Sequence, residues 1–270
     1  GYTVVEEALL HVLLGRHVVS AGALAATIGA RLAAETGRRD IADSIVAAET
    51  GICAAIPSAG SVLLIERGEA PFALLFGERE LVLLDIAGAT GKSIDALGHG
   101  IPLRRLAAGE GREIVRSADR TLVETADLLV SAQLLGIAEA ARDLAVAYAN
   151  VRHQFGQPIG GFQAIKHHCA NMAVAAEMAS AQLDMAAIAL RDGRADASFQ
   201  VAALRHLAQN AAYANTRTSV QVHGGIGFSA EADVHHYLKQ AHVLSRLGRG
   251  ADILAMAAPL APHLVMTEEV

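Results

Sequence analysis

The sequence predicts an α+β fold that is mostly helical, with a small β domain between two helical regions. Apolar residues recur at helical spacing near the amino terminus and again, over much longer stretches, in the second half of the chain. Between these regions lie short apolar runs separated by turn-forming clusters, which is the pattern of strands. We therefore expect three domains, at residues 1–40, 41–115 and 116–270.

The composition limits the class of protein. Hydrophobic residues make up 53% of the 270 residues, enough for a large core, and the formal net charge is −6 with no extended basic run. These values exclude a nucleic-acid footprint. Two cysteines are too few for a disulfide framework, so we expect a protein of the reducing cytoplasm.

The first region shows helical periodicity from Thr3 to about Glu35, with breaks at Gly15 and around Gly22. This spacing predicts two or three short helices. The sequence begins abruptly inside the first of them, without the basic and apolar segments of a signal peptide. We therefore expect residues upstream of Gly1.

The second region has the pattern of strands. Apolar runs at 61–66, 72–76 and 81–86 are separated by turn-forming clusters that each contain a glycine. Connections of this length are typical of hairpins, so the runs predict a small antiparallel β module.

The third region has no strand signals. Long helices are expected at 117–150, 161–191, 195–222, 231–245 and 250–258, and their short connections predict a bundle. The most apolar window, 128–147, contains charged residues that would be costly in a bilayer, so we interpret it as a core helix. Met172, Met178 and Met185 are likewise interpreted as core residues.

A loop between two of these helices carries residues suited to an anion. In the stretch VRHQFGQPIGGFQAIK at 151–166, Arg152 ends one helix, and the glycines and Pro158 prevent its continuation. A guanidinium offers a fork of donors that matches phosphate. The loop is therefore a candidate clamp for an anionic cofactor, and the alternative is a plain helix connection with an exposed arginine.

A second glycine-rich loop completes a family resemblance. RHQFGQPIGGFQ at 152–163 is followed, after a long helical stretch, by QVHGGIGF at 221–228. This pair closely resembles the carboxy-terminal domain of acyl-CoA dehydrogenases. The helical, β, helical order is similar to that family's three-domain fold, and the resemblance covers essentially the whole chain, most firmly after Ala126.

The resemblance implies that both motifs bind FAD held mainly by a neighbouring subunit. The residues that would grip its diphosphate and adenosine are Arg152, Gln154, Phe155, Gln163, Gln221, Gly224 and Gly225. It also implies α,β-dehydrogenation of an acyl-CoA thioester, with electron-transfer flavoprotein as the acceptor.

The chain departs from the family at the catalytic base. The family removes the α-proton with a glutamate at one of two positions, which fall here at Gly248 and Ala126, and neither side chain accepts a proton. Glu124 and Asp127 flank Ala126 but point about 200° and 100° away from it on a helix. We expect both on an exposed helix face, and the alternative is a displaced base at one of them.

A second departure lies in the β domain. The resemblance implies a Thr-Glu-Pro-type segment and a Trp-containing strand that hold the flavin, but this chain has no Trp and offers only Glu49-Thr50-Gly51. Metal binding is not expected, because the neighbouring residues at 167–169 and 235–236 diverge by about 100° on a helix and cannot chelate together.

Three hypotheses remain open from the sequence. The leading one is a non-catalytic subunit of a heteromeric α2β2 acyl-CoA dehydrogenase, which completes the FAD site of a partner that carries the glutamate. The resemblance extends to bacterial enzymes that shorten steroid side chains and other bulky acyl-CoAs. The second is a self-sufficient homotetramer with Glu124 or Asp127 as its base, and the third is a non-enzymatic scaffold or thioester-binding protein. None of the three involves nucleic acid or a membrane.

Overall fold

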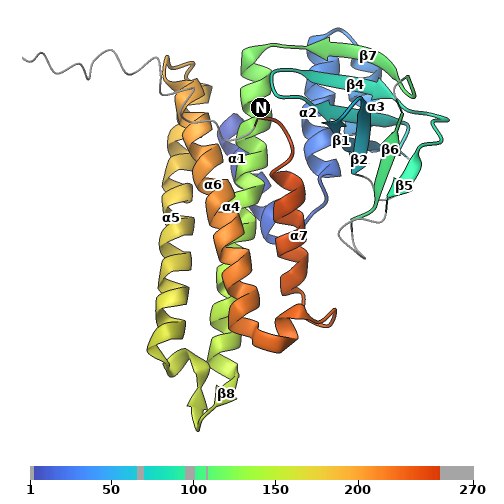
Figure 1. Ribbon diagram of the computed structural model, residues 1–270. Coiled ribbons are helices and arrows are strands. Elements are labelled where there is room, and N and C mark those ends of the chain that lie inside the picture. Colours follow the sequence, from blue (N-terminus) through green and yellow to red (C-terminus); the bar gives the residue numbers. More distant parts are fainter. Residues whose placement is uncertain (1–2, 66–69, 95–100, 108, 250–270) are drawn as a thin grey trace, which may run out of the picture.

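The protein folds into a long helical bundle with a β sheet and two short helices beside one of its ends (Figure 1). The computed structural model describes residues 3–65, 70–94, 101–107 and 109–249. The helix expected at 250–258 lies outside the described residues. The architecture is the mostly helical α+β fold that the sequence predicts.

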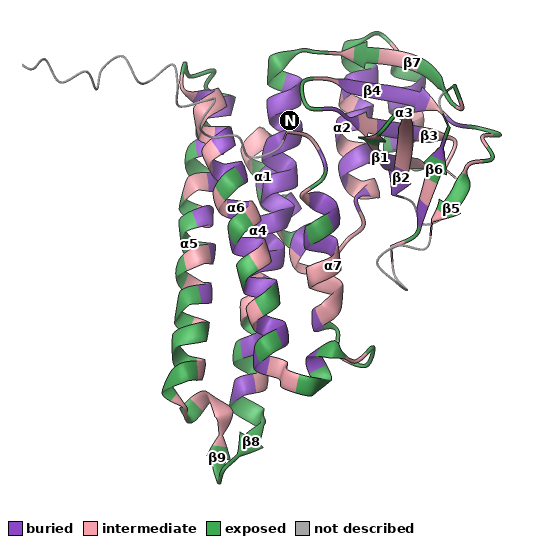
Figure 2. Cartoon of the chain, viewed as in Figure 1, coloured by how far each residue is buried: buried purple, intermediate pink, exposed green. Residues whose placement is uncertain are grey.

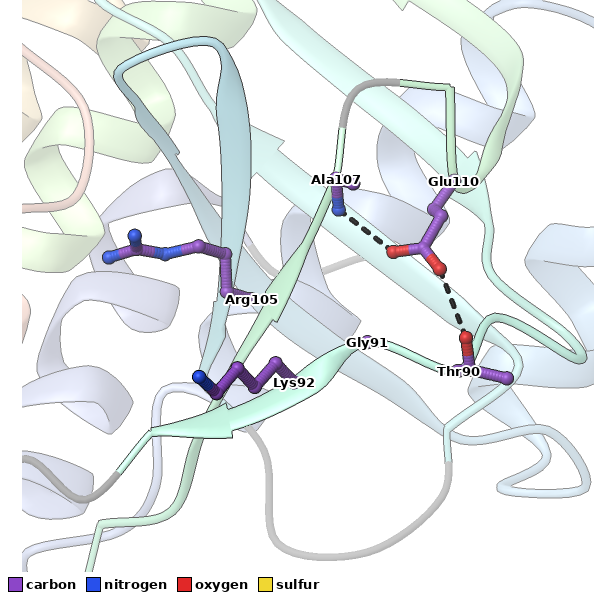
Figure 3. A pocket seen from close by; sticks show the side chains of 6 residues that line it. All are labelled: Thr90, Gly91, Lys92, Arg105, Ala107 and Glu110. Atoms are coloured by element: carbon purple, nitrogen blue, oxygen red, sulfur yellow. Dashed lines mark hydrogen bonds between the residues drawn. The ribbon is translucent and has the colours of Figure 1, made fainter.

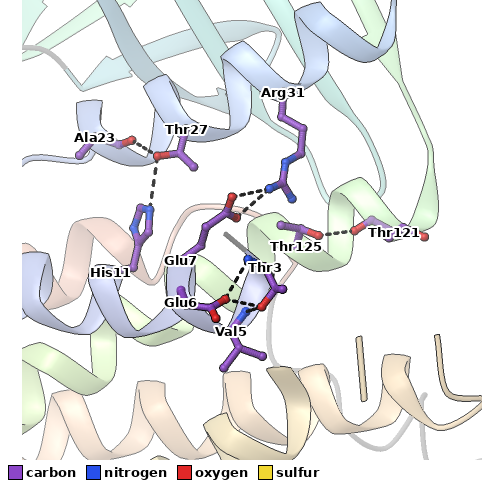
Figure 4. Close-up of polar contacts among 10 residues, drawn as sticks. All are labelled: Thr3, Val5, Glu6, Glu7, His11, Ala23, Thr27, Arg31, Thr121 and Thr125. Atoms are coloured by element: carbon purple, nitrogen blue, oxygen red, sulfur yellow. Dashed lines mark hydrogen bonds and ion pairs between the residues drawn. The ribbon is translucent and has the colours of Figure 1, made fainter. Parts of the chain in front are cut away.

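The amino-terminal region forms α1 (Val4–Arg16), α2 (Gly22–Glu35) and α3 (Arg39–Val46). A capping box at Thr3 and Glu6 fixes the start of α1. Arg31 of α2 donates to both carboxylate oxygens of Glu7, at 2.6 and 2.7 Å, which ties α2 to α1 (Figure 4). The periodicity of residues 3–35 thus yields two helices.

A buried histidine joins these helices to the bundle. His11 is 1% exposed, and its Nδ1 lies 3.1 Å from Gln133 Nε2 of the central helix α4 (Arg120–Val151). Its Nε2 lies 3.4 Å from Thr27 Oγ1, which itself donates to Ala23 (Figure 4). Burial lowers the pKa of His11 to about 4. The imidazole is therefore neutral at pH 7.

In the residues that the structure describes, the β domain is one sheet of seven strands in the order β5-β6-β2-β1-β3-β4-β7. The strands are β1 (Ile52–Ser58), β2 (Ser61–Ile65), β3 (Phe72–Phe76), β4 (Leu81–Asp85), β5 (Lys92–Ile94), β6 (Leu103–Leu106) and β7 (Arg112–Ser117). The expectation of an antiparallel module is wrong at one pairing, because β1 and β3 run parallel. β2 occupies one edge of β1, so β3 adds to the other edge.

The carboxy-terminal region is a bundle of long helices around α4. After α4 come the hairpin strands β8 (His153–Gln154) and β9 (Gln157–Pro158), the turn η1 (Ile159–Gly161), α5 (Gln163–Arg191), α6 (Ala197–His223), the turn η2 (Gly224–Phe228) and α7 (Val234–Leu244). Figure 2 shows that α4 is buried along most of its length, whereas α5 lies at the edge of the bundle. Each long helix appears where the sequence predicts it.

Two described helices, α4 and α5, are long and apolar enough to cross a membrane by length and composition. The most apolar window of α4 is 94% buried inside the protein, so α4 is a core helix, as expected. The corresponding window of α5 is only 39% buried. Met172 is buried, but Met178 and Met185 are 54% and 45% exposed, so their assignment to the core is wrong.

Candidate functional site

The first motif folds as a tight hairpin at the carboxyl end of α4. Arg152 is the C-cap of α4; its N–H donates to the Tyr148 carbonyl at 2.9 Å, and its own carbonyl accepts from Ile159 N–H at 2.8 Å. Gln154 pairs with Gln157, which leaves Phe155 and Gly156 as a two-residue loop with φ of 51° and 82°. Two positive φ values are typical of a type I′ turn, in which glycine suits both positions.

The conformation of Phe155 is unusual for a residue with a side chain. A positive φ is rare for non-glycine residues and is strained for a bulky one. Phe155 is 92% exposed, and its one ring neighbour among the described residues is Phe162, at 6.1 Å between centroids in an edge-on arrangement. Strain and exposure together mark this ring as a contact for something outside the chain.

The second motif lies at the same end of the bundle. α6 ends at His223, and the Gly224 C-cap has a φ of 64°, a conformation that favours glycine. His223 stacks on Tyr148 in the last turn of α4, with 4.3 Å between ring centroids. This stack joins the carboxyl ends of α4 and α6, and thereby brings the two motifs to one surface. Sequence reasoning missed the stack, although both residues flank the motifs directly.

The residues expected to bind the cofactor are exposed at this surface. Arg152, Gln154, Phe155, Gln163, Gln221 and Gly225 are all exposed, and Gly224 is half-buried. Within the described chain, the Arg152 guanidinium has no carboxylate partner. Gln163 Nε2 lies 3.2 Å from His167 Nε2, and no hydrogen bond joins the Arg152 side chain to the second loop in those same residues. The donors of the two loops therefore face solvent.

This surface fits a dinucleotide diphosphate. A Cβ added at Gly224 or Gly225 would meet no atom of the chain, so the packing of this chain does not itself require glycine at residue 225. A bare backbone at this point lets N–H groups approach a phosphate. The unpaired guanidinium supplies a matching charge.

The two positions at which the resemblance places a base, Ala126 and Gly248, lie near the other end of α4. Asp127, one residue after Ala126, accepts hydrogen bonds from Arg249 Nε at 2.8 Å and from Arg249 N–H at 3.2 Å. Gly248 has a φ of 72°, and a Cβ there would overlap Asp127 Oδ1. The carboxylate of Asp127 thus holds the loop at residue 248 in a conformation that leaves no room for a side chain.

A buried arginine completes this charge cluster. Arg205 of α6 is 2% exposed, and its Nη2 donates to the carbonyls of Leu244, Ser245 and Leu247 at 3.3, 3.2 and 2.8 Å. It caps the end of α7, where helix carbonyls lack partners. Burial raises the pKa of the Asp127 carboxyl, and the charges of Arg205 and Arg249 oppose that rise. We name Asp127, Arg205 and Arg249 the charge cluster.

The expectation that Glu124 and Asp127 lie on an exposed helix face is wrong. Both are 2% exposed, because α1, α6 and α7 cover α4 on several sides. Glu124 accepts a hydrogen bond from the Ser198 hydroxyl and forms an ion pair with Arg120 at 3.9 Å. Both carboxylates are therefore engaged in contacts within the chain.

An apolar cavity of about 320 Å³ lies between the sheet and α7. Its lining consists of Ile56, Leu63, Ile65, Leu103, His242, Val243 and Arg246. It borders the loop that holds Gly248, but its lining contains no carboxylate. A proton acceptor with the character of a family base is absent from these residues.

A second cavity, of about 390 Å³, opens on the β domain far along the chain from both motifs (Figure 3). Lys92 and Arg105, which are paired across β5 and β6, belong to its lining. Glu110 is held by the N–H of Ala107 at 2.8 Å and the hydroxyl of Thr90 at 3.0 Å. Among the residues that the structure describes, no group of three potential ligands could hold a metal ion.

Comparison with known proteins identifies the bundle. A family described as "Acyl-CoA dehydrogenase, C-terminal domain" matches residues 119–256. The curated protein acyl-CoA dehydrogenase FadE34 of Mycobacterium tuberculosis is 40% identical over 149 residues. The match spans 54% of this chain but only 21% of that relative, so this chain represents a fraction of the relative's length.

Solved structures share the fold over nearly the whole chain. The ChsE4–ChsE5 complex from Mycobacterium tuberculosis superposes with a TM-score of 0.72 at 22% identity, covering 98% of this chain and 82% of that chain. A Tcur3481–Tcur3483 steroid ACAD variant superposes with a TM-score of 0.73 at 21% identity, covering 95% and 80%. These similarities extend the shared fold beyond the matched bundle to the β domain and α1.

Proposed function

The chain belongs to the acyl-CoA dehydrogenase family, and on that basis we propose that it completes the FAD site of a partner subunit and supplies no catalytic base itself. The observation that carries this proposal is the separation of two surfaces along α4. Arg152 follows Asp127 by 25 residues, which is about 38 Å of helix. This separation supports placing the two motifs and the two expected base positions of this chain in different active sites.

The residues at the carboxyl end of α4 have defined roles in this proposal. Arg152 neutralises the diphosphate, and the backbone at Gly224 and Gly225 approaches it. Phe155 and Gln163 contact the adenosine end. When bound, FAD supplies the acceptor for α,β-dehydrogenation of an acyl-CoA thioester.

The proton acceptor comes from the partner. Removal of an α-proton needs a carboxylate within hydrogen-bond reach of it, and such a base contributes about 10² to 10⁴-fold in rate. At Ala126 and Gly248 this chain has none, and the nearby carboxylates of Glu124 and Asp127 are held by Ser198 and Arg249. We place the working glutamate on a second acyl-CoA dehydrogenase-like subunit in an α2β2 assembly.

The substrate class follows by analogy with the structural neighbours. One of them is a steroid acyl-CoA dehydrogenase and another is a two-component complex. We propose a bulky acyl-CoA, such as a steroid side-chain thioester, as the substrate and an electron-transferring flavoprotein as the acceptor, in the cytoplasm.

Co-purification tests the proposal. The chain is expressed alone and together with a family subunit that carries the glutamate, and flavin absorbance and acyl-CoA oxidation are measured for each preparation. We expect a colourless inactive chain alone, and a yellow active complex that loses turnover when the partner's glutamate is replaced by glutamine. A stoichiometric flavin with turnover in the isolated chain would instead identify a self-sufficient enzyme.

A further inference from the structure

Two aromatic side chains link the last turns of α4 and α6. Tyr148 lies one turn before Arg152, and His223 is the last residue of α6, directly before Gly224. Their rings stack with 4.3 Å between centroids and an angle of 22° between the ring planes. Figure 1 shows both helix ends at the end of the bundle that carries β8. The stack therefore lies between the two motifs that we propose bind FAD.

Each motif folds back onto the helix turn that holds one of these rings. A Cβ added at Gly160 would lie 3.1 Å from the carbonyl oxygen of Ala149, in the last turn of α4. A Cβ added at Gly227 would lie 2.6 Å from the carbonyl oxygen of Val220 and 3.0 Å from Cβ of His223. Contacts this close leave each loop little freedom to move relative to the turn that it packs on. A shift of either turn therefore moves the loop that packs on it.

Backbone hydrogen bonds hold both rings relative to the motifs. His223 Nδ1 lies 2.7 Å from the carbonyl oxygen of Ser219, so this nitrogen carries a proton and donates it to the hydrogen bond. The carbonyl of Tyr148 accepts a hydrogen bond from Arg152 N–H at 2.9 Å. The stack thus connects the backbone of Arg152 with the glycine loop that follows His223.

The body of the bundle has a separate contact between the same helices. Asn215 of α6 is 1% exposed, and its Nδ2 donates to the carbonyl of Ala138 on α4 and to the carbonyl of Met172 on α5, both at 3.0 Å. Tyr148 lies ten residues beyond Ala138, which is about 15 Å of helix. The stack therefore acts on the ends of α4 and α6, well beyond the contact made by Asn215.

We infer that Tyr148 and His223 are positioning residues, whose stack sets the spacing between the Arg152 loop and the loop at Gly224 and Gly225. The inference rests on the proposed function, because it concerns the same FAD surface. A diphosphate contacted by both loops has a fixed span. Groups that are held at this span before the cofactor binds lose less conformational entropy on binding. Neither ring has to contact FAD for this effect.

The experiment uses the chain co-expressed with a family subunit that carries the glutamate, and it measures the dissociation constant of FAD by titration of the flavin-depleted complex. His223→Ala should weaken FAD binding by about three- to tenfold, the factor expected for loss of one aromatic pair. His223→Phe keeps a ring against Tyr148 and should bind FAD within about twofold of the wild type. His206→Ala is the matched control, because His206 is an exposed histidine of the same helix, outside both motifs.

A double-mutant cycle separates positioning from direct contact with FAD. Tyr148→Ala should weaken FAD binding as His223→Ala does, and the double variant should bind no more weakly than either single variant, because both changes remove the same contact. Additive losses would overturn the inference. If His223→Gln binds like the wild type while His223→Phe binds like His223→Ala, a ring nitrogen contacts FAD directly and the inference is wrong.

Two further comparisons separate the inference from the proposed function and from a purely structural role. Loss of FAD in Arg152→Ala with wild-type binding in His223→Ala would overturn the positioning role and leave the proposed function standing. Wild-type binding in Arg152→Ala would overturn both. The melting temperature of each complex is measured as well. If it falls in His223→Ala while FAD binding below that temperature is unchanged, the stack serves only the fold.

Discussion

The charged residues at the two ends of α4 differ in their burial and in their partners. Near its start, Asp127 is 2% exposed and is enclosed by Arg205 and Arg249. At its carboxyl end, Arg152 is exposed and has no carboxylate partner in the described residues. Burial with internal partners indicates a structural role, whereas exposed donors and a strained ring indicate contacts with another molecule. We call the buried region around Asp127 the closed end of α4 and the exposed region around Arg152 its open end.

The largest expected effect is at the closed end. Asp127→Ala should lower the free energy of unfolding by about 3 to 5 kcal/mol, because it leaves two arginines near one another, one of them fully buried, without a counter-charge. Arg152→Ala, at the open end, should change it by less than about 0.5 kcal/mol. Urea denaturation of the isolated chain measures both. Equal effects of the two variants would contradict the division of α4 into a closed and an open end.

The sequence predicted the open end better than the closed end. Arg152, the glycines and the two phenylalanines form one local motif, and local turn chemistry follows from neighbouring residues. The burial of Asp127 depends on Arg205 and Arg249, which are 78 and 122 residues away, so helical periodicity around residue 127 could not reveal it. Arg205 did carry a signal, since it stands among the apolar residues Val201, Leu204 and Ala208 of α6.

In the β domain, too, local features could be predicted from the sequence and long-range pairing could not. The strands at 61–65, 72–76 and 81–85 follow from apolar runs between turns. β1 contains CAAIPS, which is poor in β-branched and aromatic residues, and its parallel pairing with β3 depends on the topology of the whole sheet. The exposed Met178 and Met185 could not be distinguished from core residues, because α5 has apolar residues on its exposed side as well as on its buried side.

A smaller effect on the free energy of unfolding is expected from pH, and it arises from the buried His11. His11 has a pKa of about 4 in the folded protein and about 6.5 in the unfolded chain. The unfolded chain therefore binds more protons than the folded protein between these pH values. The contribution of His11 to the free energy of unfolding is fully present above pH 6.5 and is lost as the pH falls toward 4. The loss by pH 4 is about 3 kcal/mol, since each pKa unit corresponds to about 1.4 kcal/mol.

The contacts of His11 explain why its pKa is lowered rather than raised. Nδ1 of His11 faces the amide Nε2 of Gln133, and a proton on Nδ1 would set two donors against each other. In His11→Gln the difference in unfolding free energy between pH 7 and pH 4.5 should be smaller than in the wild type. His167→Gln, on the exposed surface of α5, is the control. An identical acid dependence in wild type and His11→Gln would show that other groups cause it.

Flavin retention tests the open end. Arg152→Ala should weaken FAD binding by the assembled complex by about 1.5 to 3 kcal/mol, the range for a hydrogen bond to a charged group. Arg152→Lys should recover part of this loss, because it keeps the charge but not the planar fork. Both are followed by flavin absorbance after dialysis of the complex. Wild-type flavin content in Arg152→Ala would remove this residue from the proposed clamp.

The smallest effects come from a matched pair of glycines, one at each end. Gly248→Ala places a Cβ at a positive φ and against Asp127, so it should cost about 1 to 2 kcal/mol of stability, the range for a left-handed conformation. Gly225→Ala meets no atom of the chain and should leave stability unchanged within about 0.5 kcal/mol.

For flavin retention by the complex, we expect the larger effect at Gly225 instead of Gly248. Gly225→Ala should lower flavin retention, because a methyl group stands where the backbone would approach the diphosphate, and Gly248→Ala should retain flavin as the wild type does. If Gly225→Ala destabilises the isolated chain instead, that glycine serves the fold, and the open end loses one of its reasons to be a cofactor surface.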